Sequence, residues 1–526
     1  MVTAKRWLLL IGGVLIGTAA VLALLASRIE PRLRSDVERA LAKRLDSTVT
    51  LDSFDVRLFP RPAIVGRGLV IRHRGRTDLP PLITITSFTG HTGWEGLYSR
   101  HITEVMLDGL EITIPPQRRA DMPSLSGPSS GDDGDASASD NGSAARDSGP
   151  PFSIQTVTAT NARLSIMPKR ADKDPRIFDI YALSIHDLTF VTPSTFVASL
   201  TNPIPQGLIE TNGAFGPWNR DEPSETPVEG RYIFNADLGT IKGIAGAVAA
   251  QGQFNGVVNH IATSGSTKTP DFRLPKLKAS ALALQTTYRA VVDGTNGDVH
   301  LEHVDVHLGG STFIAKGLIV GTKGIKGKRV VLNVTSEKAL MADILRLTVR
   351  TLPPAMTGAV RLKASFDLPQ GPADVLDKLR LEGQVAVNGA RFTTPTVQDK
   401  VDELSQRGLG RPKDPGIDNV PSRINSAFSL KAGVLTLHSL AYLVPGAAIT
   451  MSGAYNLESG TLNFSGAARL DASLSRTQTG YRRFLLKPFD PLFRKGGTGT
   501  RVAINVSGTV DEPKIGVDLK RTLRGQ

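Results

Sequence analysis

The chain of 526 residues contains no cysteine. This absence excludes disulfide bonds, thiolate metal sites, cysteine nucleophiles and a lipid-modified cysteine at a processed N-terminus. A chain without cysteine is compatible with an oxidising compartment such as the periplasm, but the absence does not by itself require that location.

The sequence also lacks the residue spacings that catalysis needs. Residues 127–131 spell G-x-S-x-G, but a nucleophile elbow requires a strand before these letters and a helix after them. This stretch instead lies among small polar residues. No defensible spacing of nucleophile, base and acid occurs elsewhere. We therefore expect a protein that is not an enzyme, has no catalytic residues and needs no cofactor.

Three histidines, His300, His303 and His307, are close enough in sequence to suggest a metal site. The Val and Leu residues around them alternate with a period of two, which indicates a strand. On a strand His303 and His307 would lie about 13 Å apart, too far to share an ion. We expect solvated strand residues and no metal site.

A basic stretch contains Lys323, Lys326, Lys328 and Arg329. It lacks the G-x-x-x-x-G-K-[ST] spacing of a phosphate loop. We expect a solvated turn beside an edge strand, with contact to anionic headgroups as the alternative.

The composition is that of a folded protein with many short strands. Hydrophobic residues make up 40% of the chain but aromatic residues only 6%, and the 52 glycines and 33 prolines punctuate short apolar runs along its whole length. The net charge of +13 favours an anionic membrane surface or a nucleic acid as a partner. The N-terminal segment favours the membrane, so we expect no nucleic acid partner.

Residues 8–26 form a charge-free stretch of nineteen residues. As a helix with a rise of about 1.5 Å per residue, it nearly spans a hydrocarbon core of about 30 Å. The alternative is a cleaved signal peptide, but its apolar region is usually about 7 to 15 residues long, and Leu24 occupies a position where cleavage favours a small residue. Basic residues on both sides of the stretch do not favour export of the body, although long domains translocate largely regardless of such charge.

Composition divides the chain into four parts. Residues 1–27 are expected to form a cytoplasmic stub and a transmembrane anchor, and residues 28–116 a short amphipathic helix followed by strands. Residues 117–150 are rich in Ser, Gly, Asp and Ala, which predicts a disordered linker or loop. Residues 151–526 contain the repeated strand pattern described next.

Within residues 151–526, the segments 297–317 and 433–453 carry matching apolar residues at a constant offset of 136 residues. In both segments the period of two breaks at the same place, which predicts a turn or a bulge. The apolar members of the repeat are our candidates for the lining of a groove: Val299, Leu301, Val304, Val306, Leu308, Phe313, Leu435, Leu437, Leu440, Tyr442, Val444 and Ile449.

A second repeat, at an offset of 52, lies on either side of the linker. Ile102, Val105, Ile112 and Ile114 return as Ile154, Val157, Leu164 and Ile166, as an interrupted sheet would explain. Helical patterns are few, the clearest being 337–347 and 397–404. Stacking about 25 strands at about 4.8 Å would produce an array on the order of 120 Å long.

Several passages together resemble the AsmA-like family. These are the N-terminal anchor and helix, LDSFDVRLFPRPAIVGRGLVI, LEGQVAVNGARFTTPTVQDKVDELSQRGLG and GTRVAINVSGTVDEPKIGVDL. The resemblance implies a mainly β protein with an elongated, curled antiparallel sheet that forms an open apolar groove, similar to bridge-type lipid carriers. An N-terminal transmembrane helix and a few short capping helices complete the expected fold.

The resemblance also implies a location and partners. We expect a single-pass protein of the bacterial inner membrane with a large periplasmic domain that binds phospholipids and contributes to their delivery and to outer-membrane biogenesis or homeostasis. Outer-membrane or other envelope proteins are possible partners. The alternative is a scaffold or assembly factor that transports no lipid and affects the insertion of outer-membrane proteins.

One segment near the C-terminus interleaves aromatic and basic residues, as expected at a membrane interface. Its aromatic side could equally plug one end of the groove. The membrane-interface candidates are Arg482, Arg483, Phe484, Lys487, Phe489 and Phe493.

Overall fold

A computed structural model describes residues 34–517, apart from 36, 44, 58–60, 94, 96–100, 117–152, 190, 278–279, 350–352, 413, 474–475, 477–499 and 511. The predicted anchor at 1–27, the predicted linker at 117–150 and the membrane-interface candidates between 482 and 493 lie outside the described residues. Within the described part of the chain, no helix is long and apolar enough to cross a membrane.

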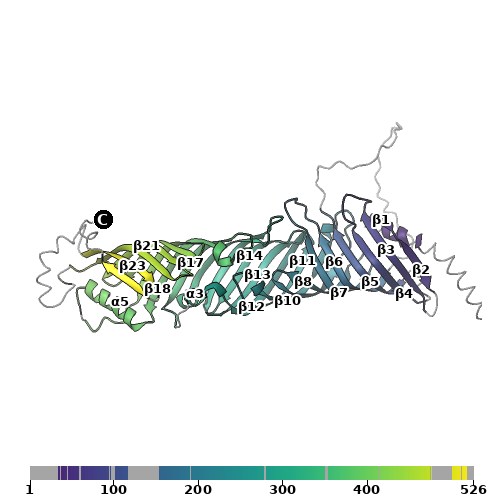
Figure 1. Cartoon of the computed structure of the whole chain (residues 1–526). Coiled ribbons are helices and arrows are strands. Elements are labelled where there is room, and N and C mark those ends of the chain that lie inside the picture. The colour runs from purple at the N-terminus through teal and green to yellow at the C-terminus, as the bar shows by residue number, and fades with distance from the viewer. Residues whose placement is uncertain are drawn as a thin grey trace, which may run out of the picture.

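The described chain forms one strongly curled sheet of 24 strands, which gives the molecule an elongated shape (Figure 1). The first half of the sheet contains β1 Ser47–Thr50, β2 Ser53–Arg57, β3 Ala63–His73, β4 Ile83–His91, β5 His101–Ile114, β6 Ser153–Ile166, β7 Arg176–Leu188, β8 Ser194–Pro203, β9 Gln206–Phe215, β10 Pro227–Asp237, β11 Ala247–Val257 and β12 His260–Phe272.

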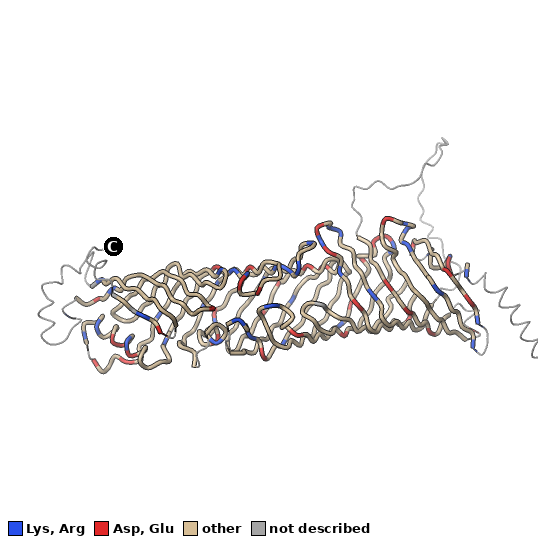
Figure 2. The backbone as a smooth tube through the Cα atoms, in the orientation of Figure 1, with Lys and Arg blue, Asp and Glu red and all other residues tan. Residues whose placement is uncertain are grey.

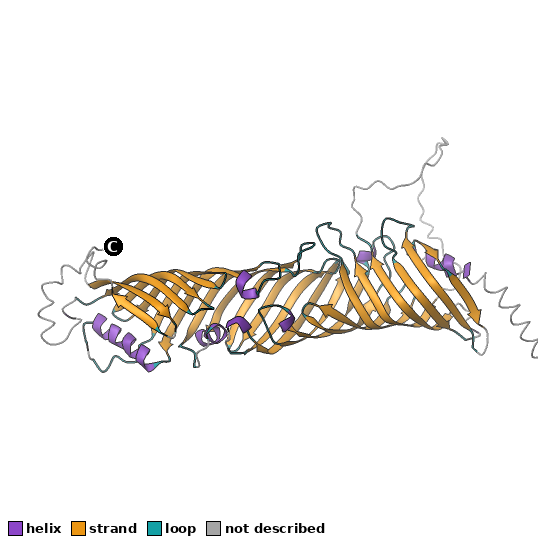
Figure 3. Cartoon of the chain, viewed as in Figure 1, coloured by secondary structure: helices purple, strands orange, loops and turns teal. Residues whose placement is uncertain are grey.

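The second half contains β13 Leu282–Asp293, β14 Asp298–Leu308, β15 Ser311–Val320, β16 Arg329–Leu340, β17 Met356–Leu368, β18 Arg380–Phe392, β19 Ser422–Lys431, β20 Val434–Val444, β21 Ala447–Asn456, β22 Thr461–Leu470, β23 Thr500–Thr509 and β24 Pro513–Val517. Short helices lie between strands (Figure 3): η1 Pro223–Glu225, η2 Leu238–Thr240, η3 Pro275–Leu277, α3 Met341–Thr348, α4 Val375–Lys378 and α5 Pro395–Gly408.

Each strand from β3 to β24 pairs with the next strand along the chain, while β1 and β2 both pair with β3. All of these pairs are antiparallel except β5 with β6, which is parallel. The expectation of a mainly β, curled antiparallel sheet is confirmed, except that β5 and β6 form a parallel pair.

The parallel pair explains the repeat at offset 52. Ile102 lies opposite Ile154, Val105 opposite Val157, and Ile112 opposite Leu164. The offset is therefore the register of β5 on β6. Equivalent apolar residues are cross-strand neighbours on one face of the sheet.

The repeat at offset 136 corresponds to two hairpins, β14–β15 and β20–β21. The predicted irregularity is present in both, because the register shifts between Leu301 and Val304 in the first hairpin and between Leu437 and Leu440 in the second. A bulge at the same place in each hairpin keeps the apolar residues before and after it on the same face.

The two predicted helices exist with different bounds. The pattern at 337–347 predicted a helix, but α3 begins only at Met341 because β16 continues to Leu340, where Ala339 pairs with Val360 of β17. The pattern at 397–404 falls within α5, which is longer than predicted and begins with Pro395 at a position that tolerates proline.

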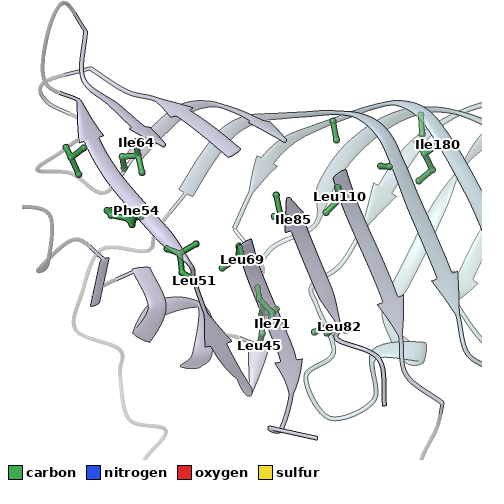
Figure 4. Packing of buried hydrophobic residues seen from close by; sticks show 14 residues of the cluster. Leu45, Leu51, Phe54, Ile64, Leu69, Ile71, Leu82, Ile85, Leu110 and Ile180 are labelled. Carbon is green, nitrogen blue, oxygen red and sulfur yellow. The ribbon is translucent and has the colours of Figure 1, made fainter. Parts of the chain in front are cut away.

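The largest hydrophobic core lies at the N-terminal end of the sheet. Residues 34, 35, 37–43 and 45 are helical, and Leu45 packs with Ile71 and Leu82, all three being almost completely buried. Figure 4 shows these side chains gathered on one side of the sheet. Smaller clusters occur around Val360 and around Val401. Among the described residues, these clusters cover only parts of the sheet.

Candidate functional site: the inner face of the curled sheet

One face of the sheet is free of charge over thirteen successive strands. We call it the inner face and define it by cross-strand register through Tyr232 on β10, Val304 on β14 and Leu437 on β20. From β10 to β22 its positions carry only aliphatic, aromatic, small or hydroxyl side chains. The period-two pattern of each strand places the charged residues on the opposite, outer face.

The inner face is the concave one. Apolar side chains of this face from β1 to β9 surround a single cavity of about 220 Å³, together with Val37 and Leu41 of the N-terminal helical segment. Ile166 of β6 also packs in one cluster with Val258 and Val228 from the far ends of later strands. Residues on such distant strands meet only if the sheet curls toward the face that carries them.

All twelve groove candidates lie on the inner face. In the first hairpin, Val304 lies opposite Tyr288 on one side and Ala315 on the other; in the second, Tyr442 lies opposite Ile424 and Ile449. Val304 and Val444 are buried and the other ten are half-buried. The structure thus places all the candidates on one surface, although the two hairpins lie six strands apart along it.

The outer face is polar and carries the histidine cluster. His303 lies on this face of β14, where its Nε2 is 3.0 Å from Oδ1 of Asp305. Among the described residues no group of three or more His, Asp or Glu side chains is arranged to hold a metal ion. Arg231, Gln253, Arg289 and His303 line a broad open hollow of about 1250 Å³ on this side.

Comparison with known proteins found no family model, curated protein or solved structure that matches this chain.

The strand ends form two rims, and their loops meet across the groove. The first rim carries loop 167–175 and the second rim carries loops 294–297 and 321–328. Nζ of Lys173 on the first rim lies 2.6 Å from Oδ2 of Asp298 on the second and 2.5 Å from the carbonyl oxygen of Gly321. The Lys173 side chain is only 6% exposed and Asp298 21%, so this ion pair is largely removed from water.

The rims touch at further places along the molecule, and we call this line of contacts the seam. Two backbone hydrogen bonds cross it, from the Lys323 N–H to the Asp172 oxygen at 2.8 Å and from the Val375 N–H to the Lys242 oxygen at 3.0 Å. The ion pairs that cross it are Arg74–Asp221, Lys276–Asp377 and Lys276–Glu458. In Figure 2 basic and acidic residues lie side by side in the connecting loops. The groove is bridged at these places rather than open.

The prediction for the basic stretch is confirmed in part: Lys323, Lys326 and Arg329 are exposed as expected of a solvated turn, but the turn does not adjoin an edge strand. Loop 321–328 joins β15 and β16, which are both interior strands of the sheet. Nζ of Lys328 is held by the carbonyl oxygens of Asn296 and Gly297, and burial lowers its pKa despite the nearby Asp298. Arg329 forms a bidentate pair with Asp367. Lys328 therefore ties an otherwise exposed turn to loop 294–297, and Arg329 pairs with the neighbouring strand β17.

The inner face also carries pairs of hydroxyl groups that sequence patterns did not reveal, among them Tyr442 with Ser422, 2.6 Å apart. The hydroxyls of Tyr232 on β10 and Tyr288 on β13 are hydrogen-bonded to each other. Burial, reinforced by this bond, raises the pKa of the Tyr288 hydroxyl. Nearby, the Oγ1 atoms of Thr267 and Thr286 are 2.8 Å apart. The signal for these pairs lies in the cross-strand register, which the sequence does not display.

Proposed function

We propose that this chain is a membrane-anchored lipid-binding and lipid-transfer protein of the bacterial envelope, related to AsmA-like proteins. In this proposal residues 8–26 anchor it in the inner membrane and the curled sheet extends into the periplasm. The groove formed by the inner face carries phospholipid acyl chains and contributes to phospholipid delivery and to outer-membrane biogenesis or homeostasis.

The observation that carries this proposal is the half-buried, charge-free inner face. In a β-sandwich the apolar face of a sheet is covered by a second sheet. Here no second sheet covers the candidates on β14 and β20 among the described residues, and most remain half-buried, although Tyr442 and Val444 pack in one cluster with Val401 and Leu404 of α5. An apolar surface of this length that no second sheet covers suits a ligand that is itself long and apolar.

The free-energy cost of exposing a lipid acyl chain to water is large. Moving an acyl chain into water costs about 0.8 kcal/mol per CH₂, hence roughly 12 kcal/mol for a chain of about sixteen carbons. An inner face without charge removes most of this cost along its length. The seam limits the path of the polar headgroup, because at the bridged places a headgroup cannot protrude between the rims.

Site-specific photocrosslinking tests this function. A benzophenone amino acid replaces Leu301 or Leu437 on the inner face, or Glu302 or His438 on the outer face, in the full-length chain expressed in bacterial membranes. After irradiation in cells, mass spectrometry of the purified protein detects covalent lipid adducts. We expect phospholipid adducts at the two inner positions and none at the matched outer positions.

The outcome separates transport from a structural role. Lipid adducts confined to the inner face support a lipid-binding groove, and native mass spectrometry then counts the lipids per chain. A folded protein with no adduct at any position would favour the scaffold or assembly factor.

A further inference from the structure

The Tyr232–Tyr288 pair stands out because it joins two aromatic hydroxyls across four strands of the inner face. The two residues are separated by β11 and β12, and their side chains reach each other over two glycines. Gly252 lies opposite Tyr232, Gly265 lies opposite Gly252, and Tyr288 lies opposite Gly265. The four residues form one row across four strands of the inner face.

The glycines are required by this arrangement. A Cβ atom added to Gly252 would lie 2.5 Å from the Ser264 carbonyl oxygen and 2.6 Å from the Tyr232 hydroxyl. One added to Gly265 would lie 2.5 Å from the Gln251 carbonyl oxygen and 2.8 Å from the Tyr288 hydroxyl. The two rings therefore lie over the sheet surface, with their hydroxyls above the glycine pair. The hydroxyls face the concave side, where a ligand would lie.

The hydrogen-bond count leaves one donor unused. The two hydroxyls carry two hydrogens, and their mutual bond uses one of them. Within the described part of the chain, neither hydroxyl has another hydrogen-bond partner. A half-buried donor without a partner is unfavourable, so this hydrogen is available to an acceptor atom on a ligand.

We propose that the Tyr232–Tyr288 pair is a subsite that donates a hydrogen bond to an ester carbonyl of an acyl lipid held in the groove. This inference rests on the proposed function and deepens it. A neutral carbonyl suits the site better than a phosphate, because no cationic side chain occurs on the inner face from β10 to β22 to balance a buried anion. The apolar lining on both sides, with Ile209 on β9 and Val304 on β14, then takes the hydrocarbon.

The test compares two phospholipids that differ only in the carbonyl. Full-length protein, purified and stripped of lipid, is loaded from an equal mixture of a diacyl phospholipid and its dialkyl ether analogue with the same headgroup and chain length. The bound lipids are then quantified by mass spectrometry. We expect the diacyl form to be enriched by about threefold to tenfold, the contribution of one hydrogen bond.

Three variants locate the donor. Y232F and Y288F each leave one hydroxyl with one free hydrogen, so each should retain the enrichment. The double variant Y232F/Y288F has no donor and should bind both lipids equally. Y442F is the matched control, because Tyr442 lies elsewhere on the inner face with its hydroxyl 2.6 Å from Ser422, and it should behave like the unaltered protein. T267V/T286V should also retain the enrichment.

The outcomes distinguish this inference from the proposed function. Equal binding of the two lipids by the unaltered protein would overturn the subsite and leave the groove intact. Enrichment that persists in the folded double variant, or disappears in T267V/T286V, would overturn the assignment to the tyrosines. Binding of neither lipid would overturn both proposals. Because the first comparison uses the unaltered chain, it remains decisive even if a variant fails to fold.

Discussion

At the scale of single residues, the seam depends most on the pair formed by Lys173 and Asp298. A buried charge that loses its partner typically costs about 3 to 5 kcal/mol. Asp298 would keep a weaker contact with Lys328, 3.4 Å away, so the lower end of this range applies to Lys173→Met. We expect the amide hydrogens of Lys323 and Gly324 in this variant to exchange with solvent about 100-fold faster, as measured by hydrogen–deuterium exchange.

A neighbouring ion pair provides the control for this variant. Arg170 pairs with Asp172 in the same loop, but the two side chains are 65% and 52% exposed. Exposed pairs contribute little to stability, so Arg170→Met should leave exchange at the two amides nearly unchanged. Equal acceleration in both variants would mean that the loop as a whole, and not the buried pair, controls the seam.

The same pair predicts a dependence on pH. Burial alone would raise the pKa of the Asp298 carboxyl, but hydrogen bonds from Lys173 and the Gly321 N–H, with the charge of Lys328, outweigh it and hold the pKa below its ordinary value. Because the pKa is lower in the closed seam than in the open one, the pair stabilises the seam fully above about pH 5, and the stabilisation is lost as the pH falls below about 4 through the lowered pKa.

Exchange protection of the Lys323 amide, corrected for its intrinsic rate, measures this effect. Protection should be constant between pH 7 and 5 and should decrease at lower pH. Asp298→Asn removes the titrating group, so its protection should be lower at neutral pH and should vary little with pH. If protection fell equally with decreasing pH in the unaltered protein and in the Asp298→Asn variant, another carboxylate would be responsible.

At the scale of elements, the parallel pair β5–β6 constrains the segment between its strands. A parallel connection must return along the length of a strand. Fourteen residues of β5 span about 46 Å at about 3.3 Å per residue, so the return needs at least about fourteen extended residues. The chain provides residues 115–152 for this purpose.

We therefore expect β5 and β6 to stay paired until the connection becomes shorter than this minimum length. Removal of about fifteen residues within 121–146 should preserve the sheet, whereas removal of all 26 should disrupt the pairing of β5 with β6. Circular dichroism and exchange protection of the β6 amides measure the pairing. A variant with residues 121–146 replaced by a glycine–serine segment of equal length is the control and should fold normally, because length and not sequence is the requirement.

Sequence patterns predicted strands, bulges and faces well because these features are local. The period-two alternation around Val304 and Leu440 specifies which side chains share a face, and a break in the period specifies a bulge. The offset of 52 was visible in the sequence, but its meaning as a parallel register was not. The start of α3 was misplaced because pairing of Ala339 with Val360 extends β16, and such pairing depends on residues distant in the chain.

At the scale of the whole molecule, the sequence could not reveal the seam. Lys173 and Asp298 are 125 residues apart; Lys173 lies in a polar loop and Asp298 is the first residue of β14. Their contact depends on how far the sheet curls over the strands between them, which is the sum of many small strand twists. The basic stretch was placed beside an edge strand for a similar reason, because the interior position of β15 and β16 depends on pairing with β14 and β17.

The seam leads to a prediction about lipid movement through the whole molecule. If lipids enter or leave the groove laterally, the rims must separate, and covalent links across the seam should prevent this. The chain lacks cysteine, so introduced pairs are the only thiols. D172C/K323C and K242C/V375C each replace residues joined by a backbone hydrogen bond across the seam. Such bonds place Cα atoms about 5 Å apart, within the range of a disulfide.

We expect the oxidised variants to exchange fluorescent phospholipid with vesicles more than tenfold more slowly than the same variants after reduction. The control is S224C/N259C, whose residues are joined by a backbone hydrogen bond within the second rim. Its oxidation should not alter exchange, because this link does not join the two rims. Unchanged exchange in both seam variants would instead indicate that lipids pass lengthwise through the ends of a closed channel, with the seam as a permanent structural contact.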